Sequence, residues 1–406
     1  MKKIGLLTQI LIAFVIAIIL GAIVGPGIEV VKPLGDLFLR LIKFIIVPLV
    51  LASLVVGVAG TGDIKRIGRM GGITFVYYIV TTAIAVTIGL VLANIFRPGS
   101  GLDMTLSSDT AVPTAAPNVV DTILGIIPTN PIASVVETNM LQIIFFAIFI
   151  GIAIAMLGEK AKTVYNFFDE FAEIMYKITN IVMKTAPIGV FGLIAPIVGQ
   201  YGVSVLLPLI KLILVVYAGC ILHAVLVYSG SVKIFSKQSP LKFFKGIAPA
   251  SLVAFSTSSS SGTLPVTMKC TEENLGVSKK VSSFVLPLGA TINMDGTALY
   301  QGVCVLFIAQ FMGIELSFTQ QLIIVITATL ASIGTAGVPG AGLIMLTMVV
   351  TAVGLPLEAI ALVAGVDRIL DMIRTSVNIT GDASAAVVVQ ALEDKRELKA
   401  TSNVSA

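Results

Sequence analysis

Long stretches without a single charged residue recur along this chain. A helix that spans a membrane needs about 20 consecutive, predominantly apolar residues. Stretches that meet or approach that length lie at residues 4–28, 44–62, 70–96, 186–210 and 212–232. Because 56% of the 406 residues are hydrophobic and only 12% are charged, a soluble domain could not cover its surface with polar groups. The sequence therefore predicts an all-α integral membrane protein that crosses the bilayer several times.

The chain starts with Lys2 and Lys3 and an apolar run, as secretory signals do. No small-residue cleavage pattern follows and further spans come after it, so we expect a retained first helix. Later basic residues fall after even numbers of crossings, where the positive-inside rule places them in the cytoplasm. They are Lys65, Arg66, Arg69, Lys160, Lys162, Lys233, Lys237, Lys242, Lys245, Lys395, Arg396 and Lys399. We expect a multi-pass protein of the cell membrane with both termini cytoplasmic, and its net charge of +4 implies no nucleic-acid binding.

A polar segment divides the first half of the chain. Residues 99–130 are rich in Pro, Ser, Thr, Ala and Asp, and they are expected to form an outward-facing loop. Three spans precede this loop. Three more are expected at 131–158, 164–198 and 203–230, which returns the chain to the cytoplasmic side.

Two later segments are too polar at their centres for simple spans. Residues 257–263 are seven small or polar residues in the middle of an uncharged segment, and Pro265 follows them. Such residues favour turns, and lysines flank both ends, so a re-entrant hairpin entering from the cytoplasm is expected. The glycine-rich residues 334–342 interrupt a second uncharged segment, whose flanks are acidic. They predict a second hairpin that enters from outside.

Each predicted hairpin is followed by an apolar helix that carries polar residues, at 293–297 and at 367–382. Interrupted segments at corresponding positions of two inverted repeats point to the binding site of a secondary transporter. The expected fold is therefore eight transmembrane helices plus two re-entrant helical hairpins.

The last helix carries a polar stripe. Asp367, Asp371, Arg374, Asn378 and Asp382 follow one another in steps of three or four residues, which places them on one helix face. Charged residues at membrane depth normally mark a path for ions or substrate. The alternative is a purely internal network of salt bridges. Arg368 lies one residue off the stripe and is expected to point elsewhere.

The charges of these segments do not balance. Asp295, Asp367, Asp371 and Asp382 oppose Arg374, so the carboxylates need protons or bound cations. Carboxylate, amide, hydroxyl and carbonyl oxygens favour sodium. An arginine can hold a carboxylate bidentately, and an aspartate one turn away suits an ammonium group, so Arg374 and Asp371 predict an acidic amino acid as substrate. The hairpin tips would add hydroxyls and backbone N–H groups for the α-carboxylate.

At these residues the chain resembles the sodium-coupled glutamate/aspartate transporter family. Four motifs occur in order: SSSSGTLP at 258–265, NMDGTALY at 293–300, GTAGVPGAG at 334–342 and DMIRTSVNITGD at 371–382. The resemblance covers nearly the whole chain. It implies a homotrimer and an elevator mechanism, with a scaffold at about 1–70 and 98–200, a transport unit at about 71–97 and 201–392, and a cytoplasmic tail at 393–406.

The resemblance also implies the binding residues. Arg374 would hold the side-chain carboxylate of the substrate and Asp371 its amino group. The rest of the substrate site would be Ser259, Ser260, Thr297, Val338, Gly342, Thr375 and Asn378. Three places for co-transported sodium would use Tyr78, Thr81, Thr82, Gly289, Thr291, Asn293, Met294, Asp295, Ser332, Ile333, Thr335, Asn378 and Asp382. No organic cofactor is implied, and the partners would be the substrate, sodium and membrane lipid.

Some residues depart from the family pattern. Gln301 stands where proton-coupled animal relatives carry glutamate, which argues against proton symport of their kind. Ser258 stands where some archaeal relatives have a hairpin arginine, and Arg368 could supply an equivalent charge. Carriers of cystine or C4-dicarboxylates in the same family remain alternatives.

Three other classes are weaker. An ion channel would not need the pair of Asp371 and Arg374 beside two hairpins. An intramembrane serine protease would need a general base, and the single histidine, His223, lies about 35 residues before the serines. A packed or lipid-facing His223 is favoured over a metal ligand. Three widely spaced cysteines give no redox motif.

Overall fold

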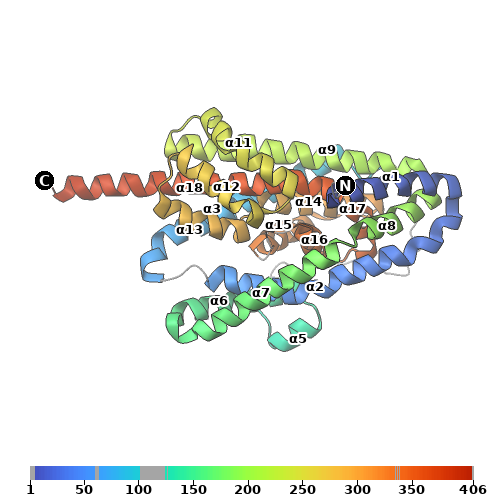
Figure 1. Ribbon diagram of the computed structural model, residues 1–406, viewed down its shortest axis with the longest axis horizontal. Helices are drawn as coiled ribbons and strands as arrows, with labels where there is room; N and C mark the ends of the chain where they lie inside the picture. The colour runs from blue at the N-terminus through green and yellow to red at the C-terminus, as the bar shows by residue number, and fades with distance from the viewer. Residues whose placement is uncertain are drawn as a thin grey trace.

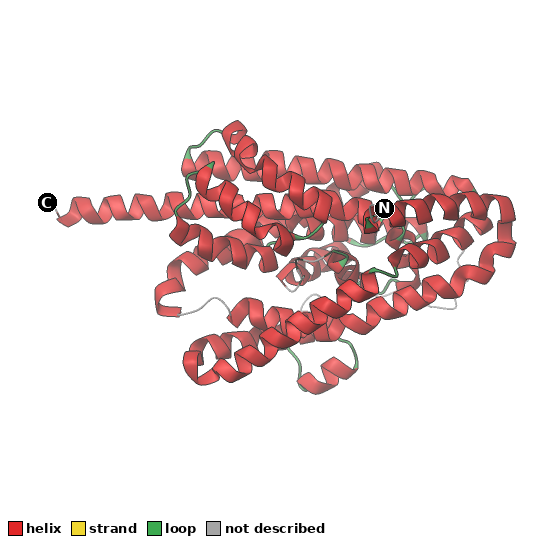
Figure 2. Cartoon of the chain, viewed as in Figure 1, coloured by secondary structure: helices red, strands yellow, loops and turns green. Residues whose placement is uncertain are grey.

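The computed structural model describes residues 5–59, 64–100, 124–125, 127–333, 335, 337 and 339–404. All regular secondary structure within these ranges is helical (Figure 2). The predicted loop at 99–130 lies almost entirely outside the described residues.

The first half of the chain forms helices that leave one long polar segment between α3 and α5. The elements are α1 (Leu6–Val24), η1 (Gly25–Val31), α2 (Lys32–Ala59), α3 (Ile64–Phe96), α5 (Pro131–Val136), α6 (Met140–Leu157), η2 (Gly158–Ala161), α7 (Lys162–Met183), α8 (Ala186–Tyr201) and η3 (Val203–Val205).

The second half contains shorter helices joined by tight turns. The elements are α9 (Leu206–His223), η4 (Ala224–Tyr228), α10 (Ser229–Ser231), η5 (Val232–Ser236), α11 (Pro240–Thr257), α12 (Ser260–Glu273), α13 (Lys279–Ile292), α14 (Asp295–Phe311), α15 (Phe318–Ile333), α16 (Ala341–Ala352), η6 (Leu357–Ala359), α17 (Ile360–Ala364) and α18 (Asp367–Val404).

Several helical stretches are long and apolar enough to cross a membrane. Within the described residues there are four, Thr8–Phe38, Arg69–Phe96, Leu206–Ser236 and Lys279–Phe311, and a fifth if Phe145–Met183 and Ala186–Gln200 form one bent span. Neither of the predicted runs at 164–198 and 186–210 is one straight helix. α7 and α8 meet at a bend of 51°, and α8 ends before Gly202, whose φ of 73° a helix cannot continue.

At the positions of the two predicted hairpins, the chain forms two pairs of helices, α11 with α12 and α15 with α16. α11 ends at Ser258 in the left-handed region (φ 53°), and the next residue, Ser259, begins α12 by accepting a 3.0 Å hydrogen bond from the N–H of Gly262. Serine is a favoured N-cap, so the serine run both ends one helix and starts the next. In the second hairpin Gly340 takes φ 82° directly before α16.

The helix after the first hairpin is broken at its centre. α13 ends at Ile292, Asn293 is extended (φ −93°, ψ 95°), and α14 begins at Asp295. This break frees backbone groups beside the polar side chains of the NMDG segment. A break of this kind is tolerated at membrane depth where it is buried in protein, and the span it interrupts is fully buried.

The helices pack in two groups (Figure 1). In one group α1 packs on α8, and α2 packs on α6, α7 and α8. In the other α3 packs on α9, α14 and α15, while α18 packs on α11, α12, α13 and α14. α18 runs through the second group and continues past the bundle at its C-terminal end.

Close packing within the first group depends on glycine. A Cβ on Gly192 of α8 would lie 2.9 Å from the Cβ of Leu34 and closer still to the backbone of Gly35 in α2. Small residues at such a crossing let two helix backbones approach. We expect Gly192→Ala to destabilise the protein by about 1–3 kcal/mol. In detergent its Tm should fall clearly, whereas Gly72→Ala in α3, where nothing lies within 4 Å of the added carbon, should not lower the Tm, because alanine favours a helix over glycine.

Candidate functional site

The tips of the two hairpins meet at one backbone carbonyl. The oxygen of Gly337 accepts a 2.8 Å hydrogen bond from the Ser259 hydroxyl and a 3.1 Å bond from the N–H of Ser261. On its other side, a Cβ on Gly337 would lie 2.7 Å from the oxygen of Ala290 in α13. Only glycine allows this close approach, so the glycine-rich sequence brings both hairpins onto the broken helix.

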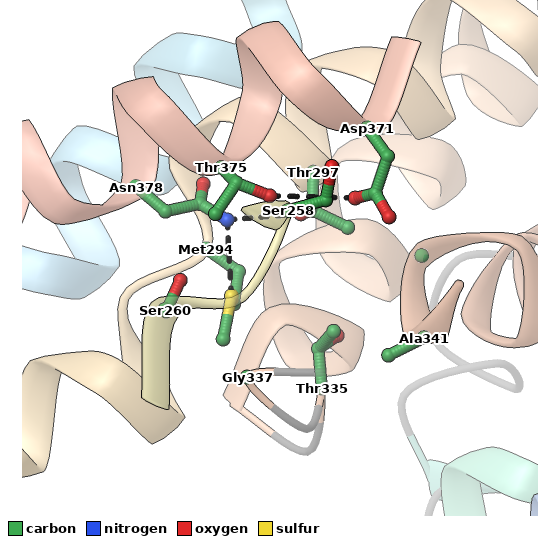
Figure 3. Close-up of a pocket in the computed structure, with 11 residues that line it drawn as sticks. Ser258, Ser260, Met294, Thr297, Thr335, Gly337, Ala341, Asp371, Thr375 and Asn378 are labelled. Carbon is green, nitrogen blue, oxygen red and sulfur yellow. Dashed lines mark hydrogen bonds between the residues drawn. The ribbon is translucent and has the colours of Figure 1, made fainter. Parts of the chain in front are cut away.

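A small pocket lies beside this meeting point, with about 210 Å³ of empty space. Figure 3 shows side chains from both hairpins, α14 and α18 around it. The pocket contains six of the predicted substrate residues: Ser260, Thr297, Gly342, Asp371, Thr375 and Asn378. Thr335 and Met294, which were predicted for sodium, also line it. Ser259 binds the other hairpin instead, and Val338 lies outside the described residues.

Sequence reasoning missed one polar residue of this pocket. Ser258 lines it, is buried, and its hydroxyl has no hydrogen-bond partner within the described part of the chain. Its place at the end of the serine run could have identified it, but the family resemblance directed attention to Ser259 and Ser260.

Asp371 receives donors on both carboxylate oxygens. Oδ1 lies 3.0 Å from Arg374 Nε and 3.4 Å from the Thr375 hydroxyl, and Oδ2 accepts a 3.0 Å bond from the N–H of Gly340. The last bond joins α18 to the tip of the second hairpin. The carboxylate therefore both lines the pocket and is hydrogen-bonded to the tip of the second hairpin.

Arg374 is fully buried and does not line the pocket. Its Nη1 lies 2.8 Å from Asp367 Oδ1, and its Cζ lies 4.0 Å above the ring of Tyr300. The Tyr300 hydroxyl also donates to Asp367 at 2.9 Å. Nη2 has no hydrogen-bond partner among the described residues, and the guanidinium carbon lies 2.9 Å from where a Cβ on Gly342 would be. A donor thus remains free directly behind the pocket wall.

The expectation that Arg368 points away from the stripe was wrong. Its Nη1 lies 3.9 Å from Asp371 Oδ2, and its Nη2 donates to the backbone oxygen of Thr257 at 3.3 Å. Arg368 and Arg374 therefore face Asp367 and Asp371, and the formal charges of these four groups cancel.

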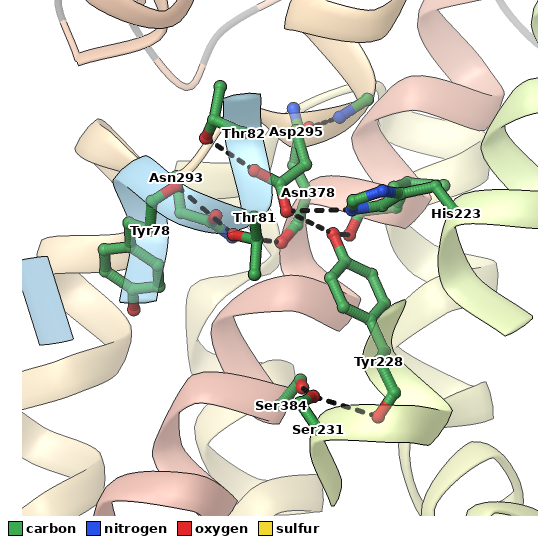
Figure 4. Close-up of polar contacts among 12 residues, drawn as sticks. Tyr78, Thr81, Thr82, His223, Tyr228, Ser231, Asn293, Asp295, Asn378 and Ser384 are labelled. Carbon is green, nitrogen blue, oxygen red and sulfur yellow. Dashed lines mark hydrogen bonds and ion pairs between the residues drawn. The ribbon is translucent and has the colours of Figure 1, made fainter. Parts of the chain in front are cut away.

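Asp295 lies in a second polar cluster, on the other side of α14 (Figure 4). Its Oδ1 accepts a 2.6 Å bond from Thr82, and its Oδ2 lies 2.9 Å from the hydroxyl of Tyr228 and 3.1 Å from Nε2 of His223. His223 is packed, as expected, but sequence reasoning missed its partner and missed Tyr228 altogether.

The local fold of residues 224–228 explains how both residues reach one carboxylate. In an α-helix His223 and Tyr228 would point about 140° apart. Residues 224–228 instead form a π-helical turn, in which hydrogen bonds join residues five apart. Residues at that spacing then lie on one side of the helix, and the rings of His223 and Tyr228 contact edge to face at 4.9 Å.

Asp382 completes the second cluster. It accepts a 2.8 Å bond from Asn293 Nδ2, while Asn293 Oδ1 has no partner in the part of the chain that the structure describes. A Cβ on Gly289 would lie 2.6 Å from the hydroxyl of Tyr78 and 2.5 Å from Asp382 Oδ1. The absence of a side chain at Gly289 thus lets both of these oxygens approach its backbone. No ion pair with lysine or arginine involves Asp295 or Asp382 within the described ranges.

The remaining predicted cation ligands lie nearby but bind their own helices. The hydroxyls of Thr81, Thr291, Ser332 and Thr335 donate to backbone oxygens at 3.2, 3.0, 2.8 and 2.8 Å. The backbone oxygens of Thr291, Ser332, Ile333 and Thr335 were the predicted ligands of one sodium ion, and Thr81 was predicted for another. Met294 contributes its sulfur, which accepts a 3.1 Å bond from Asn378 Nδ2.

The sequence is similar to known proteins over nearly its full length. The model of the sodium:dicarboxylate symporter family matches residues 6–392. The chain is 41% identical to the proton/sodium-glutamate symport protein of Geobacillus stearothermophilus, over 97% of this chain and 96% of that protein. It is 39% identical to the proton/glutamate-aspartate symporter of Escherichia coli K12, over 98% and 95%. Identity to C4-dicarboxylate transport protein 1 of Ralstonia nicotianae is 38%, over 98% and 94%.

These matches and the apolar helices define a multi-pass membrane protein of the secondary symporter class, and not an enzyme. The chain belongs to the sodium:dicarboxylate symporter family.

Proposed function

We propose that this protein imports an acidic amino acid, glutamate or aspartate, by symport with sodium ions. One observation carries the proposal: the buried charges separate into a neutral cluster beside the pocket and a negative cluster next to it. Asp367 and Asp371 face two arginines, whereas Asp295 and Asp382 face hydroxyls, amides and one histidine.

The negative cluster supplies the driving cation site in this proposal. Two buried carboxylates without a paired arginine or lysine are strongly disfavoured unless cations bind beside them. Asn293 Oδ1 is a free acceptor there, and the hydroxyls of Tyr78 and Thr82 lie close by. Hard oxygen ligands of this kind suit sodium.

The pocket supplies the substrate site. Asp371 would receive the ammonium group, and Arg374 would turn from Asp367 to bind the side-chain carboxylate. Ser260, Thr297, Thr375 and Asn378 line the pocket and would add neutral hydrogen bonds. An acidic amino acid adds one net negative charge to a neutral cluster, so its binding would favour a sodium ion in the adjacent one.

The larger architecture belongs to the same proposal. The scaffold would be residues 1–70 and 98–200, and the transport unit residues 71–97 and 201–392, with 393–406 as a cytoplasmic tail. The two packing groups support this division, since α1 packs with α8 and α3 packs with α14. Eight spans, two re-entrant hairpins, cytoplasmic termini, a homotrimer and elevator movement of the transport unit are part of the proposal.

Uptake into proteoliposomes tests the function. The purified protein should accumulate radiolabelled aspartate or glutamate against its gradient when sodium is imposed outside. A proton gradient of equal size at constant sodium is the matched comparison, because the names of the G. stearothermophilus and E. coli relatives include protons. Accumulation driven by protons alone would contradict sodium coupling.

A substrate panel separates the alternatives. Cystine and C4-dicarboxylates should compete poorly with acidic amino acids, since neither combines one amine with one side-chain carboxylate. Stronger uptake of succinate or cystine would contradict the proposed substrate. Flux that only follows the substrate gradient would indicate a channel.

A further inference from the structure

Three hydroxyls form a triangle that lies outside both the pocket and the cation cluster, and of their residues Ser384 is buried while Tyr77 and Ser231 are half-buried. The hydroxyl of Tyr77 lies 2.8 Å from that of Ser231 and 2.6 Å from that of Ser384, and the two serines lie 3.1 Å apart. Each hydroxyl has one proton to donate, so the three protons are shared among the sides of the triangle and the backbone oxygen of Tyr228, which accepts from Ser231. The triangle joins α3, α10 and α18, which are distant in sequence.

The triangle lies against the π-helical part of the span after α9. Ser231 is the last residue of α10, which separates η4 from η5, another π-helical turn. Its hydroxyl also lies 3.1 Å from the backbone oxygen of Tyr228 (Figure 4). Tyr228 is the residue whose side chain holds Asp295. One hydroxyl of the triangle therefore supports the turn that presents a donor to Asp295.

The other two corners adjoin the residues around Asp382. Ser384 follows Asp382 by two positions in α18, so it points to the opposite side of that helix. Tyr77 precedes Tyr78, whose hydroxyl approaches Asp382 at Gly289 and donates to the oxygen of Val285 at 3.0 Å. The hydrogen bond between the hydroxyls of Tyr77 and Ser384 thus restrains both the rotation of α18 about its axis and the shift of α3 along its own axis.

We propose that Tyr77, Ser231 and Ser384 are positioning residues for the cation cluster, which set the placement of Asp295 and Asp382 through the π-helical turn and α18. This inference rests on the proposed cation coupling. Carboxylates that must bind a small ion at fixed distances tolerate little displacement, because hard-cation ligation depends on cavity size and ligand placement. The pocket residues are on other parts of α14 and α18, so substrate affinity at saturating cation should not depend on the triangle.

Tyr77→Phe is the sharpest test, because it removes one hydroxyl and keeps the ring. The sodium concentration for half-maximal uptake should rise about two- to tenfold, which corresponds to the loss of one or two net hydrogen bonds. KM for the amino acid at saturating sodium should stay within about twofold of the wild type. Ser384→Ala should give the same shift, and the double variant should add little, since both changes open one triangle.

Tyr217→Phe is the matched control. Its hydroxyl also links the span of α9 to α18, donating to the oxygen of Ile369 at 3.0 Å, but it does not contact the triangle. Its half-saturating sodium concentration should equal that of the wild type. Equal shifts in Tyr77→Phe and Tyr217→Phe, or a KM shift as large as the sodium shift, would overturn the proposal. Failure of the wild type to respond to sodium would instead overturn the function on which it rests.

Discussion

Arg374→Ala is expected to reduce uptake of acidic amino acids by a factor of at least about 100, because breaking a buried ion pair leaves its partners uncompensated. Both Asp367 and Asp371 would lose their closest cation, at 2.8 and 3.0 Å. Under the proposed function, the substrate carboxylate would also lose the guanidinium that is proposed to bind it. The loss of uptake is measured from the initial rates of aspartate and glutamate uptake, with KM and the maximal rate determined separately.

Two variants make this result specific. Arg374→Lys keeps the charge but not the two-pronged geometry, so it should recover only part of the uptake. Arg97→Ala removes an arginine that is 60% exposed and 3.8 Å from Glu315, and surface pairs of this kind contribute little. It should transport like the wild type. Acidic uptake that survives in Arg374→Ala at normal KM would show that another group binds the substrate.

Asp382→Asn is expected to raise the half-saturating sodium concentration by about 10- to 100-fold, as the loss of a charged ligand bond implies. The change preserves shape but removes one of the two unpaired carboxylates, and its amide would face the donor of Asn293 that now lies 2.8 Å away. Maximal uptake at very high sodium should recover in part. Sodium titration of uptake, with the amino acid saturating, measures the shift.

Asp394→Asn provides the matched comparison on the same helix. Asp394 is exposed and accepts a 2.7 Å bond from Gln390, one turn before it. Its removal should leave the sodium titration unchanged. If the two variants behaved alike, Asp382 would have no part in cation binding.

The helical class and both hairpins could be predicted from the sequence for clear physical reasons. Runs of membrane length without a charged residue indicate that lipid surrounds the helix, and serine, glycine and proline at the centre of such a run indicate a turn. The positions of bends are harder to predict. The bend between α7 and α8 falls on Lys184 and Thr185, and the break at Gly202 follows Gln200, so both carried local signals. The apolar runs on either side outweighed those signals and were read as continuous spans.

The stripe on α18 could be predicted because helical spacing alone puts its members on one face. Contacts between side chains could not be predicted in this way. Arg368 was judged by its angle on the same helix, yet its long side chain extends to Asp371, three residues further on, at 3.9 Å. His223 looked solitary in an apolar run, because its partner Asp295 is 72 residues away and no pattern within its own helix indicates it.

The π-helical turn at 224–228 makes the length of this span as informative as its composition. This π-helical turn holds one residue more than an α-helical turn, so a chain one residue shorter between His223 and Tyr228 would place them four apart in an ordinary α-helix, still on one face. A chain of the present length that formed an ordinary α-helix would instead point them about 140° apart. Alignments of this region should therefore be judged by residue count, since a relative one residue shorter keeps the shared contact with Asp295 through an α-helix, whereas one of equal length needs the π-helical turn.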